Sequence, residues 1–286
     1  TIRILPPVLY RHGYCYFFRG SPLTESEYVM IVLITGATAG FGEAFARKFI
    51  ENGHTVIGTG RRIERLAKLQ KEFGSKFFPL ALDMTDSPAV DNVINSLPES
   101  LREIDVLVNN AGLALGMETV DKGNPAEWDV VVDTNIKGLL HMTRAILPGM
   151  VERNRGHIIN LGSTAGSWPY AGGNVYCGTK AFVRQFSLAL RADLAGKKIR
   201  VTDIEPGMVG GTEFSGIRYR GDEEKAANTY KNTDPLMPDD IAEAVFWVAT
   251  LPSHVNINTM EMMPVCQSFV CTAKAETTTK DKPVSV

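Results

Sequence analysis

The chain has 286 residues, of which 44% are hydrophobic and 22% are charged, and its formal net charge is −2. This balance gives no indication of a nucleic-acid partner or of binding to an anionic membrane surface. No apolar run approaches the ~20 residues that a membrane-spanning helix needs. The four cysteines form no C-x-x-C pattern and the five histidines are scattered, which predicts a reducing, cytoplasmic location and no metal site.

Residues 1–29 show no clear periodicity and contain Pro6, Pro7 and Pro22. We interpret them as an upstream extension outside the fold, with Met30 as the natural start. The alternative is a signal peptide, but Pro6 and Pro7 interrupt its apolar run and no small-residue cleavage site follows cleanly. We expect the polar tail, 272–286, to be mobile, which leaves one domain at 30–271.

A regular alternation of strands and helices begins at Ile31. The apolar run Ile31–Thr35 is typical of a parallel strand that is buried on both faces. It leads into the glycine-rich turn Gly36–Gly42 and a helix over Glu43–Asn52. Glycines at such a turn let the backbone approach a pyrophosphate, whose charge the helix N-terminus receives. We therefore expect a dinucleotide here; a plain tight turn is the alternative.

The end of the second strand, Thr55–Thr59, predicts which dinucleotide binds. An NAD-binding protein usually has an acid at this point for the ribose 2′-hydroxyl, whereas this chain has Arg61 and Arg62. Two guanidinium groups suit a 2′-phosphate, so the sequence predicts NADP(H). The alternative is that the arginines only begin a helix over Ile63–Phe73, which is disfavoured because positive charge opposes the helix dipole there.

The rest of the chain continues the alternation. We expect strands at Phe77–Leu82, Ile104–Val108, His157–Leu161, Ile199–Ile204 and around Asn256–Met262, and helices that begin near Ser87, Pro125, Asn174 and Pro238. Ser87 is the expected N-cap of its helix, and Asn124 and Glu127 resemble a capping box. The stretch 208–234 lacks a strong apolar period and is expected to be a functional lid or a disordered loop.

This order of elements predicts an α/β fold of the Rossmann type, in which helices flank both faces of a doubly wound parallel sheet in a single domain. Ligands bind such sheets at the carboxyl ends of the strands. The glycine-rich turn, Asn110, Ser163 and the pair Pro206 and Gly207 all fall at those ends. One site at that edge of the sheet is therefore predicted.

Tyr176 and Lys180 are four residues apart on a predicted helix, so their side chains leave the same face. A free Tyr titrates near ~10 and is a poor base at neutral pH, but a nearby positive charge lowers its pKa. Such a phenol can take a proton from an alcohol or give one to a carbonyl, and the Ser163 hydroxyl can hold the substrate oxygen. Taken alone, the pattern is weak, because such pairs occur by chance on many helices as exposed pairs on a solvated face.

Taken together, these motifs resemble those of the short-chain dehydrogenase/reductase family over roughly Met30 to Phe269. They occur in the family's order, at Thr35–Gly42, Asn109–Gly112, Asn135, Ser163, Tyr176–Lys180 and Pro206–Gly207. The runs STAGSWPYAGGNVY, DIEPGMVGGTEFS and HVNINTMEMMPV are similar to those of the group of NADP-dependent 3-hydroxy acid dehydrogenases. This resemblance implies oxidation of serine, allo-threonine and related 3-hydroxy acids, and reduction of malonic semialdehyde.

The resemblance also implies a role for each motif residue. Tyr176 would be the general acid/base, Ser163 would hydrogen-bond the reacting oxygen, and Lys180 would bind the nicotinamide ribose and lower the pKa of Tyr176. Asn135 would hold a water in a proton relay towards Lys180, although a tolerated polar residue within a helix is the alternative there. The implied cofactor contacts are Gly36, Ala37, Thr38, Ala39, Gly40 and Phe41 at the pyrophosphate, Arg61 and Arg62 at the 2′-phosphate, Asp83 and Met84 at the adenine, Asn110 at the ribose, and Pro206, Gly207, Val209 and Thr212 beside the nicotinamide.

One departure from the family's pattern and two rival functions stay open. Some NADP-preferring relatives carry a basic residue in the glycine-rich turn, where this chain has Thr38 and Ala39, so selectivity would depend on the two arginines. An enzyme of the same fold that acts on uncharged ketones, aldehydes or sugars is one rival function. A dinucleotide-binding sensor without chemistry is another. The resemblance further implies a homotetramer assembled through helices at 128–150 and 174–195.

A 3-hydroxy acid also needs a cation for its carboxylate. Arg218 and Arg220 in the expected lid are the candidates, since lids complete such sites on closure. Arg184, on the helix of Tyr176, is a weaker candidate. The alternative is that these arginines are solvated surface residues.

Overall fold

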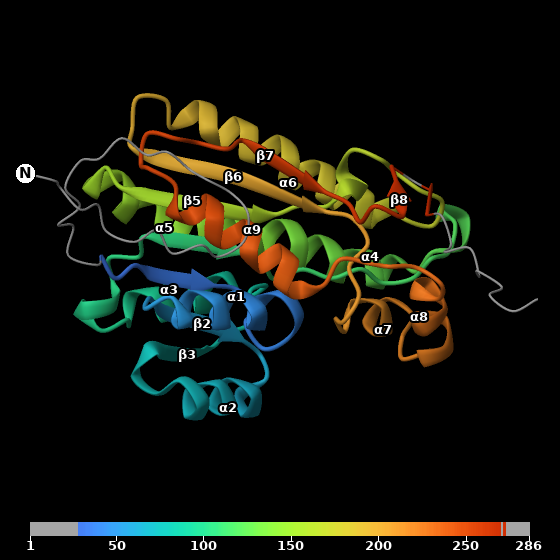
Figure 1. Ribbon diagram of the computed structural model, residues 1–286, viewed down its shortest axis with the longest axis horizontal. Helices are drawn as coiled ribbons and strands as arrows, with labels where there is room; N and C mark the ends of the chain where they lie inside the picture. Colours follow the sequence, from blue (N-terminus) through green and yellow to red (C-terminus); the bar gives the residue numbers. More distant parts are fainter. Residues whose placement is uncertain (1–27, 270, 273–286) are drawn as a thin grey trace, which may run out of the picture.

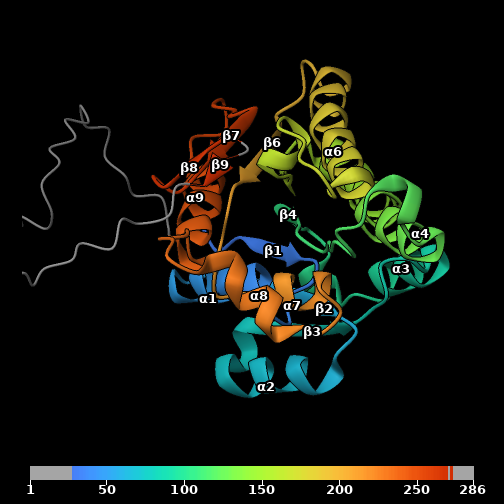
Figure 2. The same ribbon diagram turned by 90° about the vertical axis from the view of Figure 1, so that its right-hand side faces the viewer.

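The computed structural model describes residues 28–269 and 271–272, so the expectations for 1–27 and for the tail from 273 lie outside it. Within these residues, seven parallel strands form one sheet in the order β3-β2-β1-β4-β5-β6-β7 (Figures 1 and 2). The strands are β1 (Ile31–Ile34), β2 (Thr55–Gly60), β3 (Phe77–Ala81), β4 (Val106–Asn109), β5 (Gly156–Leu161), β6 (Ile199–Pro206) and β7 (Thr259–Met262).

Helices cover both faces of this sheet. They are α1 (Gly40–Glu51), α2 (Ile63–Phe73), α3 (Ser87–Asn95), α4 (Pro125–Val132), α5 (Leu139–Arg153), α6 (Asn174–Asp193), α7 (Phe214–Arg218), α8 (Glu223–Tyr230) and α9 (Pro238–Thr250). A short antiparallel pair, β8 (Gln267–Ser268) and β9 (Cys271–Thr272), follows the sheet. No helix among the described residues is both long and apolar enough to cross a membrane.

The parallel sheet with helices on both faces confirms the predicted fold class.

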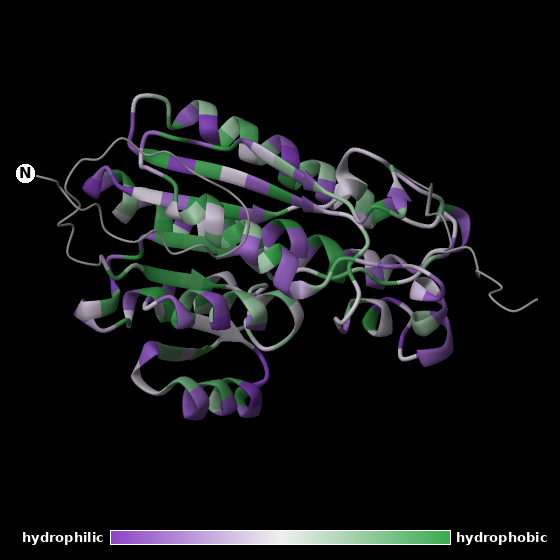
Figure 3. Ribbon diagram, in the orientation of Figure 1, coloured by the Kyte–Doolittle hydropathy of each residue, from purple (hydrophilic) through white to green (hydrophobic). Residues whose placement is uncertain are grey.

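The core consists of two apolar clusters, one on each face of the sheet. One cluster joins the strands to α1, α2 and α9, and the other joins them to α3, α5 and α6. Within β1, Val32 and Ile34 belong to the first cluster and Leu33 to the second. Figure 3 shows the strands as mostly hydrophobic, with hydrophilic residues on the outer sides of the helices. Burial of both faces explains why the strands are nearly continuous apolar runs.

The strand order reverses at β1, which has β2 on one side and β4 on the other. At such a switch point the loops after the two neighbouring strands diverge and leave a crevice. The Thr35 hydroxyl fixes the two loops by accepting hydrogen bonds from the Asn110 and Ala111 amides at 3.0 and 2.9 Å. Figure 2 shows α7 and α8 in front of this edge of the sheet.

Several predicted details are wrong. The N-cap of α3 is Asp86, which accepts from the Ala89 amide at 3.0 Å, and not Ser87. Asn124 does cap α4, but the Glu127 carboxylate pairs with Arg220 and completes no capping box. Of the two alternatives for 208–234, the disordered loop is wrong because the stretch forms α7 and α8, and the lid stays a prediction. Tyr28, placed outside the fold, donates a 2.7 Å hydrogen bond from its hydroxyl to Asp105.

Candidate active site

The glycine-rich turn connects β1 to α1 at the switch point. Gly36 and Gly40 have φ of +70° and +53°, a backbone conformation that favours glycine. A Cβ atom on Gly42 would lie 2.2 Å from the Gly36 carbonyl oxygen, so the turn and the helix pack backbone to backbone. Ala39, at the N-cap of α1, offers no side-chain cap. The first amides of α1 therefore have no side-chain acceptor at the N-cap, which suits an anionic ligand.

Three basic side chains gather beside this turn. Arg62 donates to the Thr38 hydroxyl at 3.1 Å and forms a 2.7 Å ion pair with Glu213, and Arg65 pairs with the same carboxylate at 2.7 Å. Arg61 is exposed at the cavity wall. Burial raises the pKa of Glu213, but hydrogen bonds from Arg65 and Arg62 outweigh burial and hold that pKa below its usual value. This cluster has the charge and geometry to receive a phosphate group.

The sequence interpretation missed Arg65 and Glu213. Arg65 lies three residues after Arg62 and hence on the same face of α2, a signal that helical spacing does contain. Glu213 lies in the loop after β6, 151 residues from Arg62 along the chain, and no local pattern connects the two.

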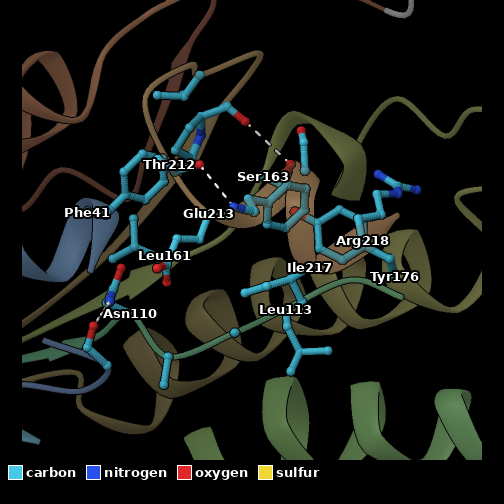
Figure 4. A pocket seen from close by; sticks show the side chains of 18 of the residues that line it. Phe41, Asn110, Leu113, Leu161, Ser163, Tyr176, Thr212, Glu213, Ile217 and Arg218 are labelled. Atoms are coloured by element: carbon cyan, nitrogen blue, oxygen red, sulfur yellow. Dashed lines mark hydrogen bonds between the residues drawn. The ribbon is translucent and has the colours of Figure 1, made fainter. Parts of the chain in front are cut away.

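A cavity of about 630 Å³ opens at the carboxyl ends of the strands. Figure 4 shows Phe41 and Asn110 towards one side of it and Tyr176 and Arg218 towards the other. Of the predicted site residues, most line it: Gly36, Thr38, Ala39, Gly40, Phe41, Arg61, Arg62, Asp83, Met84, Asn110, Ser163, Tyr176, Lys180, Pro206, Gly207, Val209, Thr212 and Arg218. The cavity is thus long enough to connect the glycine-rich turn with the Tyr176 phenol.

Four predicted residues do not line the cavity. Ala37 is fully buried in the apolar core, and its amide donates to the Thr59 carbonyl oxygen at 2.8 Å. Asn135 lies behind the cavity wall. Arg184 pairs with Glu205 at 3.1 Å, and Arg220 pairs with Glu118 and Glu127 on the outside of the molecule. In this structure the side chains of Ala37, Arg184 and Arg220 therefore lie outside the cavity.

Asn135 has a supporting position. It lies in a π-helical stretch, Asp133–Gly138, between α4 and α5, and such stretches often occur at functional sites. Its amide donates to the Leu113 carbonyl oxygen at 2.8 Å and accepts from the Leu113 amide at 2.9 Å. It also donates to Thr179 on α6 at 3.0 Å. Asn135 therefore fixes the loop after β4 against the helix of Tyr176 and Lys180.

Ser163, Tyr176 and Lys180 come together at the inner end of the cavity. The Ser163 hydroxyl accepts from the Ala165 amide at 3.1 Å and donates to the Pro206 carbonyl oxygen at 3.3 Å. The Lys180 amine lies 5.8 Å from the centre of the Tyr176 ring and donates to the Leu161 carbonyl oxygen at 2.7 Å. The prediction that Tyr176 and Lys180 leave one face of their helix is confirmed.

The electrostatics of these groups differ from the prediction. Burial raises the pKa of Tyr176, the Tyr170 phenol adds to the rise, and the Ser163 hydroxyl and the Arg218 guanidinium oppose it. Burial also lowers the pKa of Lys180 to about 8, against the field of Asp203. In the chain alone, burial outweighs the positive charges near the phenol, so the net shift of the Tyr176 pKa is upward and not downward as expected.

Arg218 is the cation closest to the Tyr176 phenol among the lid arginines. It is 8% exposed, and its guanidinium lies 5.6 Å from the centre of the Tyr176 ring. Its Nη1 donates to the Tyr170 hydroxyl at 2.6 Å, and its Nε donates to the Gly116 carbonyl oxygen at 3.3 Å. Its buried Nη2 has no hydrogen-bond partner among the described residues. The side chain therefore keeps donors available for an anion beside the phenol.

The geometry combines an anion-binding turn, a basic cluster and a hydroxyl–phenol–amine group in one cavity. The described residues bring no three His, Cys, Asp or Glu side chains together as a metal site requires. A model of the short chain dehydrogenase family matches residues 30–221. The chain belongs to the short-chain dehydrogenase family.

Individual members of the family are similar over most of the chain. The chain is 67% identical over 240 residues to the NADP-dependent 3-hydroxy acid dehydrogenase YdfG of Salmonella typhi, which covers 84% of this chain and 97% of that protein. It is 54% identical over 238 residues to the serine 3-dehydrogenase of Rhizobium radiobacter, covering 83% and 95% of the two chains.

Among solved structures, the closed form of serine dehydrogenase complexed with NADP+ is 64% identical, with a TM-score of 0.83. The match covers 84% of this chain and 96% of that one.

Proposed function

We propose that this protein is an NADP-dependent oxidoreductase that transfers a hydride between the nicotinamide and C3 of small 3-hydroxy acids. Serine, allo-threonine and the pair 3-hydroxypropionate and malonic semialdehyde are the substrates we expect. The observation that carries the proposal is the buried Arg218 guanidinium beside the Tyr176 ring, whose Nη2 has no hydrogen-bond partner among residues 28–269 and 271–272. The names of the similar proteins, a 3-hydroxy acid dehydrogenase and a serine 3-dehydrogenase, support the same substrate class.

The residues of the cavity fit NADP. The backbone of the Gly36–Phe41 turn and the first amides of α1 would hold the pyrophosphate. Arg62 and Arg61 would hold the 2′-phosphate, with Arg65 as a third cation. Asp83 and Met84 would border the adenine. When bound, NADP accepts or supplies the hydride.

The protein's own residues position the substrate and move the proton. Arg218 would bind the carboxylate through its free donor, and Ser163 would hold the oxygen on C3. The Tyr176 phenolate would then take the C3 hydroxyl proton during oxidation, and the neutral phenol would return it during reduction. Since burial raises the pKa of Tyr176, the phenolate would depend on the positive charges of Lys180 and Arg218.

A substrate panel tests this proposal. NADP-linked spectrophotometry with serine, allo-threonine, 3-hydroxypropionate and 3-hydroxyisobutyrate should show turnover, with NAD as the cofactor control. Serine amide keeps the C3 hydroxyl but lacks the carboxylate, so it should be a much poorer substrate than serine. Equal turnover of acid and amide would favour the rival enzyme of uncharged ketones, aldehydes or sugars. An absence of any turnover would favour the dinucleotide sensor.

We also propose a homotetramer assembled through α4, α5 and α6. The side chains of Val130 on α4 and Leu188 on α6 are 45% and 38% exposed, which would place apolar surface at such contacts. Light scattering of the purified protein measures the assembly, and a monomer would contradict it. The buried thiol of Cys177 beside Tyr176 is consistent with a reducing, cytoplasmic location, which fractionation of cells would test.

A further inference from the structure

A row of polar side chains crosses the buried face of the sheet beneath α5 and α6. Asn109, Asn160 and Asp203 are register neighbours on β4, β5 and β6, and all three are 3% exposed or less. Asn109 donates to Thr143 and to Asn160, and Asn160 donates to Ser187. In contrast, neither carboxylate oxygen of Asp203 has a hydrogen-bond partner in the part of the chain that the structure describes. A fully buried carboxylate in this position needs a compensating charge.

The candidate for this compensating charge is the Lys180 amine, which reaches the end of β5 next to Asp203. A Cβ atom on Gly162 would lie 2.4 Å from Oδ1 of Asp203, so the carboxylate packs directly against the Gly162 backbone. The residue before it, Leu161, accepts the hydrogen bond from the Lys180 amine at 2.7 Å. The Asp203 carboxylate and the Lys180 amine therefore approach the same short piece of backbone. Glycine at position 162 is what leaves room for the carboxylate.

A second acid on β6, Glu205, pairs with a second base on α6, Arg184. Glu205 lies two residues after Asp203, hence on the same face of β6, and it is 1% exposed. Arg184 lies one helical turn after Lys180 and pairs with Glu205 at 3.1 Å. Two acids on β6 thus face two bases on α6. Figure 3 shows the hydrophilic residues that interrupt β6.

The other groups around this cluster are known from the elements packed against it. On β7, Glu261 is the register neighbour of Glu205, and its carboxylate accepts the hydrogen bond from the Trp168 indole at 2.9 Å. On α6, the Tyr176 phenol and the buried Cys177 thiol lie about one helical turn before Lys180. The strands β5 and β4 face Asp203 with the uncharged amides Asn160 and Asn109.

The protonation of the two acids is linked. Burial raises the pKa of Asp203, the charge of Glu205 adds to the rise, and the Lys180 amine opposes it. Burial also raises the pKa of Glu205, against its contacts with Asp203 and Arg184. Two buried acids this close do not both ionise easily, so the state of Glu205 controls how much charge Asp203 carries.

We propose that Asp203 is a positioning residue for the reaction: its buried carboxylate is the counter-ion that keeps the Lys180 amine charged and directed at the end of β5. Glu205, held by Arg184, sets how fully Asp203 is ionised. The inference rests on the role of Lys180 in the proposed function. A neutral Lys180 would give no electrostatic help to the Tyr176 phenolate, so Asp203 acts on the reaction through Lys180 alone.

The direct test is the titration of the Lys180 amine itself. Lys180 lines the cavity, so its reactivity towards an acylating reagent can be measured by mass spectrometry across a pH series, without cofactor or substrate. Asp203→Asn keeps the shape of the side chain and removes its charge. The midpoint of Lys180 reactivity should fall by roughly one to two pH units, because the variant removes an opposite charge that favours the charged amine.

The sign follows from the direction of the shift. The pKa of Lys180 is already lowered to about 8 by burial, so the wild-type amine loses its charge as the pH rises through that value. Without Asp203 the loss occurs at a lower pH. The alkaline limb of kcat/KM for serine oxidation should move to lower pH by the same amount. Glu205→Gln should act in the opposite direction, because Asp203 would ionise more fully and raise the Lys180 midpoint.

The matched control is Asp105→Asn. Asp105 is another buried acid, at the opposite end of the sheet, where it accepts from the Ile31 amide at 2.9 Å. This change should leave the Lys180 midpoint where it is. If Asp203→Asn leaves the midpoint unchanged, or if it does not fold and Glu205→Gln gives no rise, the proposal is wrong. A shifted midpoint in a protein that does not oxidise serine would instead overturn the proposed function and leave only the pairing of Asp203 with Lys180 supported.

Discussion

Replacing Arg218 by alanine tests the substrate class most sharply, because Arg220 provides a control only two residues away. Arg218 is buried at the end of α7, and one of its donors has no partner in the described part of the chain. Arg220 has a positive φ of 55° and is directed outwards to Glu118 and Glu127. The two variants therefore remove the same chemical group from the inside and from the outside of the cavity wall.

The expected loss of activity follows from the hydrogen bond that Arg218 would donate to the substrate carboxylate. A hydrogen bond to a charged group contributes ~1.5–3 kcal/mol, which corresponds to roughly a 10- to 150-fold loss in kcat/KM for serine. Arg218→Ala should show such a loss. Arg220→Ala should cost no more than about threefold, because exposed ion pairs contribute little.

The assay compares serine with serine amide at saturating NADP. Arg218→Ala should lower kcat/KM for serine and leave that for the amide nearly unchanged, so the preference for the acid should collapse. NADPH affinity, measured by fluorescence, shows whether the cofactor site stays intact. Equal losses for both substrates, or equal effects of the two variants, would refute the assignment of Arg218 to the carboxylate.

Three further changes test other parts of the site. Arg62→Ala should weaken NADPH binding by roughly 10- to 100-fold while NADH binding stays the same, because one charge-assisted contact to the 2′-phosphate is lost; fluorescence titration with both cofactors measures this. Tyr176→Phe should lower kcat by orders of magnitude with NADPH affinity nearly intact, and near-wild-type turnover would remove the phenol from the mechanism. Gly42→Ala should lower the melting temperature, since its Cβ would meet the Gly36 carbonyl oxygen at 2.2 Å, whereas Gly178→Ala, with nothing within 4 Å, should leave it equal or higher.

The layout of the sheet and the position of the site could be predicted because they depend on local patterns. Buried parallel strands appear in the sequence as apolar runs. The glycine-rich turn needs positive φ at Gly36 and Gly40, which is why glycine stands at both positions. Tyr176 and Lys180 share a helical face because of spacing alone. These features need no knowledge of distant contacts.

The parts that could not be predicted depend on distant segments. The pairing of Arg62 and Arg65 with Glu213 joins α2 to the loop after β6. The contact of Arg218 with Tyr170 likewise joins the end of α7 to a distant loop, and no periodic pattern in the sequence predicts it. Which of Arg218 and Arg220 lines the cavity depends on where α7 ends, and the sequence analysis predicted no helix in this stretch.

The predictions for Ala37 and for the pKa of Tyr176 considered the motif residues without their surroundings in the fold. Ala37 belongs to the glycine-rich turn, but its side chain points into the core while its neighbours Gly36 and Thr38 line the cavity. The electrostatic prediction for Tyr176 considered the charge of Lys180 and left out burial, which is the larger effect on both groups.

The central claim is that a hydride leaves C3 of a 3-hydroxy acid for NADP while Tyr176 takes the hydroxyl proton. The most direct measurement supplies serine deuterated at C3 together with NADP and analyses the reduced cofactor by mass spectrometry. The account predicts one deuterium in each NADPH formed, and far less NADPH when Tyr176→Phe replaces the wild type. NADPH that forms without deuterium would contradict hydride transfer from C3.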